Sequence, residues 1–238
     1  MIWGAGILLK VTELIVSQGK FQLKANFSVL NGDRIAIIGP SGGGKSTLLS
    51  SIAGFIEAKS GVISLNRSQI LGLPPDQVPC TLLFQHNNLF PHLNVFNNVA
   101  LGISPNMRLN SKEKNKVYES LARVDLSEKS KSMPSSLSGG QLSRVALARA
   151  LIRNRPLLML DEAFGALGPA QRIEMLNYVK EIVANSKIIL LMVTHDPLDA
   201  KRIANQVIFV DNGVVHKPVT VDSFFDKPSS SVKRYLGI

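Results

Sequence analysis

Glycine, lysine and serine residues at fixed spacing give the clearest chemical signal in this sequence. They follow the pattern Gly-x4-Gly-Lys-Ser, and the stretch consists of Gly39, Pro40, Ser41, Gly42, Gly43, Gly44, Lys45 and Ser46. Glycines let the backbone wrap closely around a polyphosphate, so that amide N–H groups and the start of the following helix face its oxygens. The pattern predicts that Lys45 contacts the β- and γ-phosphates, that the Ser46 hydroxyl binds Mg²⁺, and that the site extends to Thr47. A glycine-rich turn that binds nothing is the alternative.

Two acids and a histidine follow buried, strand-like runs. Residues 157–160 lead into Asp161 and Glu162, and residues 188–193 lead to His195. Because open α/β sheets bind ligands at the carboxyl ends of their strands, these side chains are expected at one edge. We expect Asp161 to hold Mg²⁺, Glu162 to polarise an attacking water and His195 to reach the γ-phosphate. The alternatives are acids that only solvate a loop and a histidine that makes a structural hydrogen bond.

A second pair of glycines opens a predicted helix. Ser138 and Gln141 have the spacing of a capping box, with Gly139 and Gly140 between them. The helix should therefore begin here, with exposed amides and the positive end of its dipole available to a phosphate. An ordinary well-capped helix is the alternative, and the phosphate loop upstream favours the phosphate contact.

These residues need a parallel sheet to position them, so we predict an α/β fold of the P-loop NTPase type. Further strands are expected at 7–16, 21–29, 34–38, 62–65 and 80–84, and a sheet edge is expected at 206–211 and 214–215. Helices are expected from 87 to about 126, with a capping box at Asn110 and Glu113, and over 142–154, 169–185 and 221–227. We predict a single domain, 1–238, in which a catalytic core, 1–86 and 156–238, carries an inserted helical subdomain, about 87–155.

The charge, hydropathy and cysteine content indicate which partners and which compartment suit this protein. The 238 residues carry 27 basic and 17 acidic side chains, a net charge of +10, and the mean hydropathy is +0.15. The excess suits an anionic partner such as a nucleotide, an acidic membrane surface or nucleic acid. No run approaches the roughly 18 apolar residues of a membrane span, and the start of the chain indicates a strand and not a signal peptide. The single cysteine, Cys80, fits a reducing cytoplasm.

Four arginines, Arg144, Arg149, Arg153 and Arg155, could indicate nucleic-acid binding. Because Arg149 and Arg153 lie one helical turn apart, a solvated helix face is the favoured interpretation. We also expect no regulatory domain after residues 229–231.

Together these stretches resemble the ATP-binding cassette (ABC) family. Residues 39–46, Gln85, 137–141, 157–162 and His195 match its Walker A, Q-loop, signature, Walker B and switch-histidine motifs, in the family's order. The resemblance implies a core like that of RecA with an antiparallel β subdomain, and an ATPase that uses ATP and Mg²⁺. It implies that Gln85 serves catalysis and binds the metal beside Ser46 and Asp161. It also implies a head-to-tail homodimer, in which Ser138, Gly139 and Gly140 of one copy close over the ATP held by Lys45 of the other.

The resemblance further implies membrane partners and a location. An integral membrane permease subunit would contact Gln85 and the apolar, aromatic segment 84–95, and a periplasmic solute-binding protein would act indirectly; no nucleic-acid partner is expected. The alternative for Phe84, Phe90 and Phe96 is that they are core residues. The subunit would lie on the cytoplasmic face of a bacterial inner membrane, as a peripheral protein.

A closer similarity concerns the solute. Residues 74–110, 191–195 and the short C-terminus are similar to the ATPase subunits of bacterial thiamine importers, which implies thiamine and its phosphate esters. Importers of iron(III), sulfate or polyamines are alternatives, as are a nucleotide-binding regulator without catalysis and a soluble protein acting on DNA or ribosomes.

Three positions depart from the family pattern. Gln18 stands near the place of an adenine-stacking aromatic residue, for which Phe21 is a weak substitute. Gly168 replaces the acid of the Ser-Ala-Leu-Asp pattern, and Ala163 stands where proline is common. We therefore predict hydrolysis that is slower or less tightly coupled than in a typical member.

Overall fold

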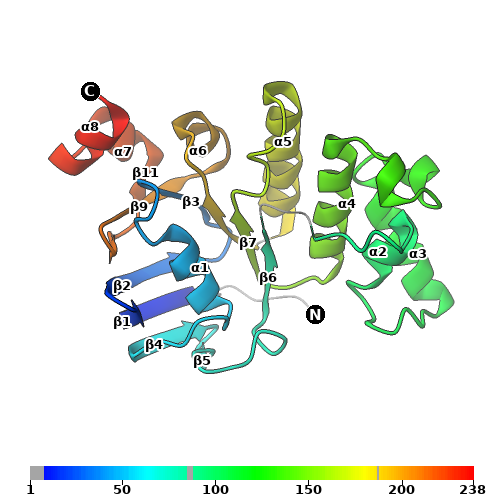
Figure 1. The fold of residues 1–238 in the computed structure, drawn as a ribbon, viewed down its shortest axis with the longest axis horizontal. Coiled ribbons are helices and arrows are strands. Elements are labelled where there is room, and N and C mark those ends of the chain that lie inside the picture. Colours follow the sequence, from blue (N-terminus) through cyan, green and yellow to red (C-terminus); the bar gives the residue numbers. More distant parts are fainter. Residues whose placement is uncertain (1–7, 85–87, 187) are drawn as a thin grey trace.

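A computed structural model describes residues 8–84, 88–186 and 188–238. Its strands form one continuous sheet in the order β5-β4-β1-β2-β10-β9-β3-β8-β7-β6, with β11 paired to β9. Figure 1 shows this sheet running through the larger part of the molecule, with helices α2, α3 and α4 grouped to one side. The predicted α/β class is therefore confirmed.

One half of the sheet, which ends at the edge strand β6, is parallel. Its strands are β3 (Arg34–Ile38), β6 (Cys80–Leu83), β7 (Leu157–Asp161), β8 (Ile189–Val193) and β9 (Gln206–Asp211). The sequences of these strands are continuously apolar because helices cover both faces of this part of the sheet. The prediction that 206–211 completes a sheet edge is wrong, since β9 lies inside the sheet between β3 and β10.

The other part of the sheet is mainly antiparallel. It contains β1 (Leu8–Gln18), β2 (Phe21–Leu30), β4 (Ser60–Leu65) and β5 (Ser68–Gln69), which pair with antiparallel neighbours. Burial alternates along β2, as expected of strands with one covered face. The short strand β10 (Val214–Val215) joins the two parts, because it pairs with both β2 and β9; β11 is Val219–Thr220.

Within the described residues, five helices flank the parallel strands, and the first of them, α1, carries Lys45 and Ser46 of the predicted site. They are α1 (Lys45–Ile52), α5 (Pro169–Ser186), α6 (Pro197–Ile203), α7 (Val221–Asp226) and α8 (Ser230–Leu236). Helix α8 is not among the helices predicted from the sequence. The signal was present, since Ser229 caps its start and Gly237 ends it in the left-handed conformation with φ 74°.

The helical group has its own core. It comprises α2 (Val95–Ala100), α3 (Ser111–Ala122), the 3₁₀ turns Ser127–Lys129 and Pro134–Ser136, and α4 (Gly139–Ile152). Val99, Val117, Leu121 and Val145 are buried together between these helices. The helical prediction for 87 to about 126 is confirmed over α2 and α3, but it is wrong for residues 88–94 and 101–110, which contain turns and irregular backbone. The boundaries at 87 and 155 stay a prediction. None of the helices in the described ranges has both the length and the hydropathy needed to cross a membrane.

Candidate functional site

The phosphate loop joins β3 to α1 with a backbone that other residues could not adopt. Gly39 has φ 155°, and a Cβ atom there would lie 1.9 Å from the carbonyl oxygen of Val210. Gly44 has φ 111°, and its added Cβ would lie 2.9 Å from the Phe21 ring. Both positions need glycine because the loop is pressed against strands of the same sheet. The structure thus places the predicted loop between a strand and a helix, and phosphate binding by it stays a prediction.

Lys45 begins α1 and is buried, with 7% of its surface exposed. Its Nζ donates hydrogen bonds of 2.9 Å to the carbonyl oxygens of Gly39 and Pro40. Burial lowers the pKa of Lys45, while the charges of Glu162 and Asp161 raise it. The ammonium group therefore lies inside the loop, in an environment where anionic phosphate oxygens would stabilise its charge.

The two predicted magnesium ligands among the described residues are in contact. Ser46 Oγ donates a 3.0 Å hydrogen bond to Oδ1 of Asp161, at the end of β7. Burial raises the pKa of Asp161; the hydrogen bond from Ser46 lowers it, the Glu162 charge raises it and the Lys45 charge lowers it. A hydroxyl and a carboxylate in contact fit Mg²⁺, which takes few protein oxygens when phosphates supply the others. In the described ranges no three His, Cys, Asp or Glu residues form a metal cluster of the all-protein kind.

Glu162 and His195 meet at the same edge of the sheet. Asp161 pairs with Val193 in the β7–β8 register, so the residues that follow each strand are neighbours. His195 Nδ1 lies 3.4 Å from Oε2 of Glu162. Glu162 has φ 48°, a left-handed conformation that is uncommon for a long side chain, and its carbonyl accepts a 3.0 Å hydrogen bond from Gly165 N. The chain turns sharply here and directs the carboxylate beside the imidazole.

A network that sequence reasoning missed lies behind His195. Asp199, on α6, accepts hydrogen bonds from Thr194 Oγ1 at 3.0 Å and from Arg172 Nε at 2.8 Å. A second Arg172 nitrogen also pairs with Asp199, and Thr194 Oγ1 accepts from Asp196 N at 3.1 Å. Asp199 is 8% exposed, so the pair is shielded from water. The sequence signal for this network is the acidic residue Asp199 on the buried face of α6.

The signature stretch begins α4 as predicted. Ser138 Oγ accepts from Gln141 N at 3.3 Å, and Gln141 Oε1 accepts from Ser138 N at 3.0 Å, so the capping box is present. Ser138 and Gly139 are exposed. In Figure 1, α5 and β7 separate α4 from α1. One chain therefore brings together Lys45, Ser46, Asp161, Glu162 and His195, and does not bring the signature glycines to them.

Phe21 and Gln18, the two residues considered for adenine stacking, lie beside the phosphate loop and the start of α1. The Phe21 ring packs against Gly44 and lies 3.5 Å from a Cβ added to Gly213. The ring is therefore already in contact with the phosphate loop. Gln18, the last residue of β1, is exposed, and its Oε1 lies 3.4 Å from Thr47 Oγ1. The weakened adenine stacking at Gln18 stays a prediction.

Gln85, expected to bind the metal and to contact a permease, lies outside the described residues. Beside it, Phe84 is partly buried and stacks edge-on with Phe55 at 5.9 Å between ring centroids. Phe96 is also partly buried, against the helical core, whereas Phe90 is 44% exposed. Core packing thus accounts for Phe84 and Phe96 in part, and not for Phe90.

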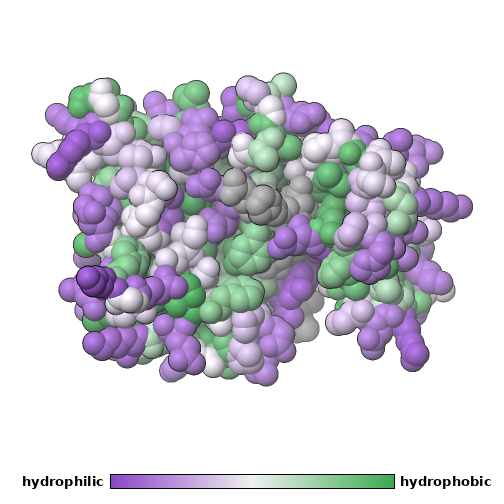
Figure 2. Space-filling model, in the orientation of Figure 1, coloured by the Kyte–Doolittle hydropathy of each residue, from purple (hydrophilic) through white to green (hydrophobic). Residues whose placement is uncertain are grey.

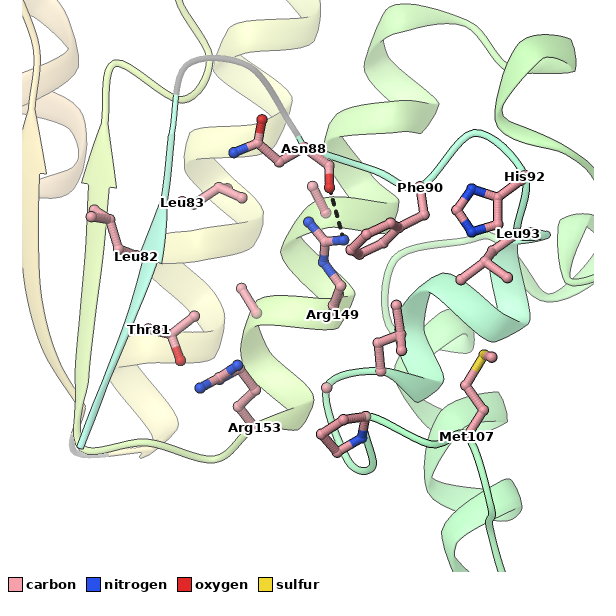
Figure 3. A pocket seen from close by; sticks show the side chains of 15 residues that line it. Thr81, Leu82, Leu83, Asn88, Phe90, His92, Leu93, Met107, Arg149 and Arg153 are labelled. Carbon is pink, nitrogen blue, oxygen red and sulfur yellow. Dashed lines mark hydrogen bonds between the residues drawn. The ribbon is translucent and has the colours of Figure 1, made fainter. Parts of the chain in front are cut away.

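Phe90 lies at a cavity of about 700 Å³ between β6 and α4, which Figure 3 shows from close by. Apolar side chains dominate its wall, among them Leu82, Leu93 and Met107. The Arg149 guanidinium lies 5.8 Å from the centre of the Phe90 ring and donates a 3.0 Å hydrogen bond to the carbonyl oxygen of Asn88. Figure 2 shows hydrophobic surface beside this region, over β6 and α4.

The interpretation of the arginines as a solvated helix face is wrong for two of them. Arg149 is held in the cavity wall, and burial lowers its pKa. Arg144 pairs with Glu174 and stacks over the ring of Tyr178 at 5.3 Å. Arg153 is exposed, in agreement with the prediction. These contacts arise because α4 packs against α2 and α3 on one side and against α5 on the other.

Comparison with known proteins adds three findings. The model of the family described as ABC transporter matches residues 23–165. The thiamine import ATP-binding protein ThiQ of Ruegeria sp. (strain TM1040) is 46% identical over 230 residues, covering 97% of this chain and 100% of that protein. The protein of the same name from Photobacterium profundum is 48% identical over 207 residues, covering 87% of this chain and 86% of the relative.

The fold also matches a solved structure. The crystal structure of the ADP conformation of MJ1267, an ATP-binding cassette of an ABC transporter, superimposes with a TM-score of 0.85. The match covers 98% of this chain and 99% of that one, at 24% sequence identity. The predicted fold, a P-loop core with antiparallel strands and a helical insertion, is therefore confirmed.

Proposed function

The chain belongs to the ABC transporter family, and on that premise we propose that it is the ATP-hydrolysing subunit of a bacterial thiamine importer. Membership makes it an ATP-binding, ATP-hydrolysing transport subunit. The assignment of thiamine is supported by relatives at 46% and 48% identity that carry this function in their names. The observation that carries the catalytic part is the convergence of Lys45, Ser46, Asp161, Glu162 and His195 at one edge of the sheet.

We assign nucleotide binding to the phosphate loop. Backbone N–H groups of the loop, from residues other than Pro40, surround the phosphates of ATP, and Lys45 exchanges its carbonyl partners for β- and γ-phosphate oxygens. Ser46 and Asp161 hold Mg²⁺, which neutralises charge on the phosphates when it is bound. Their present hydrogen bond supports this role, because it places both oxygens in one direction.

Hydrolysis is assigned to Glu162 and His195. Glu162 accepts a proton from the attacking water, and the imidazole of His195 contacts the γ-phosphate. The 3.4 Å separation between Nδ1 of His195 and Oε2 of Glu162 supports the assignment, since it allows the two groups to act on the same γ-phosphate and water. The turn at Glu162 keeps the carboxylate beside the imidazole.

The site is completed by a second copy of the chain. Ser138 and Gly139 are exposed at the start of α4 and Gly140 is buried behind them, but α5 and β7 separate these residues from the phosphate loop of their own chain. In a head-to-tail dimer they close over the ATP held by the neighbouring Lys45, where the dipole of α4 favours the terminal phosphate. ATP then joins the two copies and hydrolysis separates them.

The cavity between β6 and α4 is the proposed docking site for the permease subunit. Its wall is apolar, and its rim is rigid because buried Asn98 donates to the carbonyl oxygens of Phe90 and Leu93 and accepts from Phe90 N. Such a surface suits an apolar helix end of a membrane-embedded subunit. The ATPase subunit would then lie at the cytoplasmic face of the inner membrane, where closure of the dimer moves the docked permease.

Two measurements test the proposal. The Glu162→Gln variant should lose ATP turnover and accumulate as an ATP-bound dimer, and undiminished turnover would remove the assigned site. Cells lacking this subunit should lose uptake of labelled thiamine and regain it with the unmutated gene but not with Glu162→Gln. Normal thiamine uptake together with loss of uptake of iron(III), sulfate or a polyamine would contradict the solute assignment and leave the ATPase intact.

A further inference from the structure

The C-terminal helix α8 is packed behind the phosphate loop. Its Val232 is buried in one cluster with Ile38 and Phe209, and Ile38 is the residue before Gly39. Pro40 of the loop, Arg234 and Tyr235 line a common cavity of about 270 Å³. The last turn of the chain is therefore a neighbour of the nucleotide site.

Tyr235 connects this helix to the switch histidine. Its ring packs edge-on against Phe209, with 5.7 Å between centroids and 60° between planes. Its hydroxyl donates a 3.3 Å hydrogen bond to the backbone carbonyl oxygen of His195. Ring and hydroxyl thus make separate contacts, one with the core and one with the loop that carries His195.

The surroundings keep this hydroxyl a donor. Burial raises the pKa of Tyr235, and the negative charges of Asp196 and Glu162 raise it further. The phenol is therefore protonated at neutral pH. The influence of Glu162 also indicates that the phenol lies within electrostatic reach of the proposed general base.

We propose that Tyr235 is a positioning residue for ATP hydrolysis, which fixes the backbone of His195 and thereby the direction of the imidazole. The proposal rests on the proposed function, because it assumes that His195 acts on the γ-phosphate. Thr194 is held from the interior by Asp199, at 3.0 Å. Tyr235 holds the next residue through its carbonyl, so the loop has two anchors and the imidazole between them keeps a narrow range of orientations.

Tyr235→Phe separates this role from packing, because it keeps the ring on Phe209 and removes only the hydroxyl. We expect kcat to fall about 3- to 10-fold, because the imidazole is no longer held in the orientation that acts on the γ-phosphate, with the KM for ATP unchanged within about twofold. The thermal midpoint should stay within about 3 °C of the unmutated protein. Tyr118→Phe is the matched control: this tyrosine is 51% exposed on α3, stacks with Phe96, and should leave kcat unchanged.

A double-mutant cycle tests whether Tyr235 acts through His195. In single-turnover hydrolysis, adding Tyr235→Phe to His195→Ala should cause no further loss, because there is no imidazole left to orient. An equal loss in both backgrounds, or a normal kcat in Tyr235→Phe, would overturn the proposal. Glu162→Gln, measured alongside, keeps the two questions apart. Full turnover in that variant contradicts the proposed site, whereas its loss combined with a normal kcat in Tyr235→Phe contradicts the Tyr235 proposal alone.

Discussion

Ser46 and Asp161 are 115 residues apart in the chain, and Ser46 Oγ donates a 3.0 Å hydrogen bond to Oδ1 of Asp161. Ser46 is the second residue of α1, which follows β3, and Asp161 ends β7. The contact therefore depends on β3 and β7, the two neighbours of β8, ending at the same edge of the sheet. It is the simplest geometric reason to place Mg²⁺ between the phosphate loop and the Walker B strand.

Asp161→Asn should abolish magnesium-dependent hydrolysis without destabilising the empty protein. Burial raises the pKa of Asp161 above its ordinary value of 3.8, which outweighs the hydrogen bond from Ser46. A carboxyl whose pKa is raised by folding costs stability once the pH has risen through that pKa, and amide replacement removes this cost. Without nucleotide, the thermal midpoint at pH 7 should therefore be equal or higher, while kcat falls about 100-fold.

Exposed Asp226 on α7 supplies the control for that experiment. Asp226→Asn should change neither the midpoint nor kcat. A clearly lower midpoint in nucleotide-free Asp161→Asn would show that its carboxylate stabilises the fold. The stabilising effect of Mg-ATP on the unmutated protein should also weaken as the pH falls towards the raised pKa, because Mg²⁺ needs the ionised carboxylate.

Gly168→Asp should increase ATP turnover. Gly168 is the residue before α5, and no atom in the described parts of the chain lies within 4 Å of an added Cβ, nor is φ in the left-handed region. An aspartate therefore fits without strain and supplies the acid that the family pattern places there. Stability should change by only a few tenths of a kcal/mol, as for other Gly-to-Asp caps. Gly168→Asn is the control, since it caps the helix equally well without charge; equal kcat in all three proteins would contradict a role for the acid.

Asp199→Asn should destabilise the protein and lower kcat together. Asp199 is 8% exposed and pairs with Arg172, so removing its charge leaves the shielded guanidinium with only the more distant carboxylate of Asp196, at 3.7 Å, at a cost of about 3 kcal/mol. Urea unfolding measures the first effect and steady-state hydrolysis the second. Glu174→Gln is the matched control, because Glu174 lies on the same helix as Arg172. It breaks the ion pair with Arg144, in which the acid is 47% exposed, and should cost under about 1 kcal/mol. Similar losses in both variants would refute the distinction.

Gly39→Ala should prevent nucleotide binding and destabilise the fold by more than about 3 kcal/mol, because its Cβ would lie 1.9 Å from the Val210 carbonyl oxygen. Gly42→Ala is the control for backbone conformation. It also has a positive φ, 74°, but no described atom lies within 4 Å of its Cβ, so the cost should be about 1–2 kcal/mol. Nucleotide-free urea unfolding compares the two. Equal costs would mean that backbone conformation, and not the contact with β9, decides the need for glycine.

Phe90→Ala should reduce the amount of subunit recovered with membranes that contain the permease. Phe90 is 44% exposed at the cavity between β6 and α4, and truncating an exposed aromatic at the centre of an interface commonly costs about 2 kcal/mol of binding, or about 30-fold in affinity. Leu198→Ala, on α6 and 70% exposed, removes a similar apolar surface elsewhere. If both variants are recovered equally, the permease docks at another place.

Local patterns predicted the loop, the signature cap and the strand ends correctly. Gly39 to Ser46, the Ser138–Gln141 capping box and the residues after β7 and β8 each depend on a few neighbouring residues and on strand burial. Such features are encoded within one turn or one strand, so the sequence alone determined them. The family and the kind of chemistry followed from their order.

Other features depend on which distant segments pair. The position of β9 inside the sheet, the shielding of Arg172 by Asp199 and the hydrogen bond from Tyr235 to His195 join residues that no local pattern connects. Only the tertiary structure decided them, because packing α5, α6 and α8 against the sheet brings polar side chains together from separate helices. The sequence by itself determined what the residues at the strand ends can do; the fold decided which further residues hold them in place.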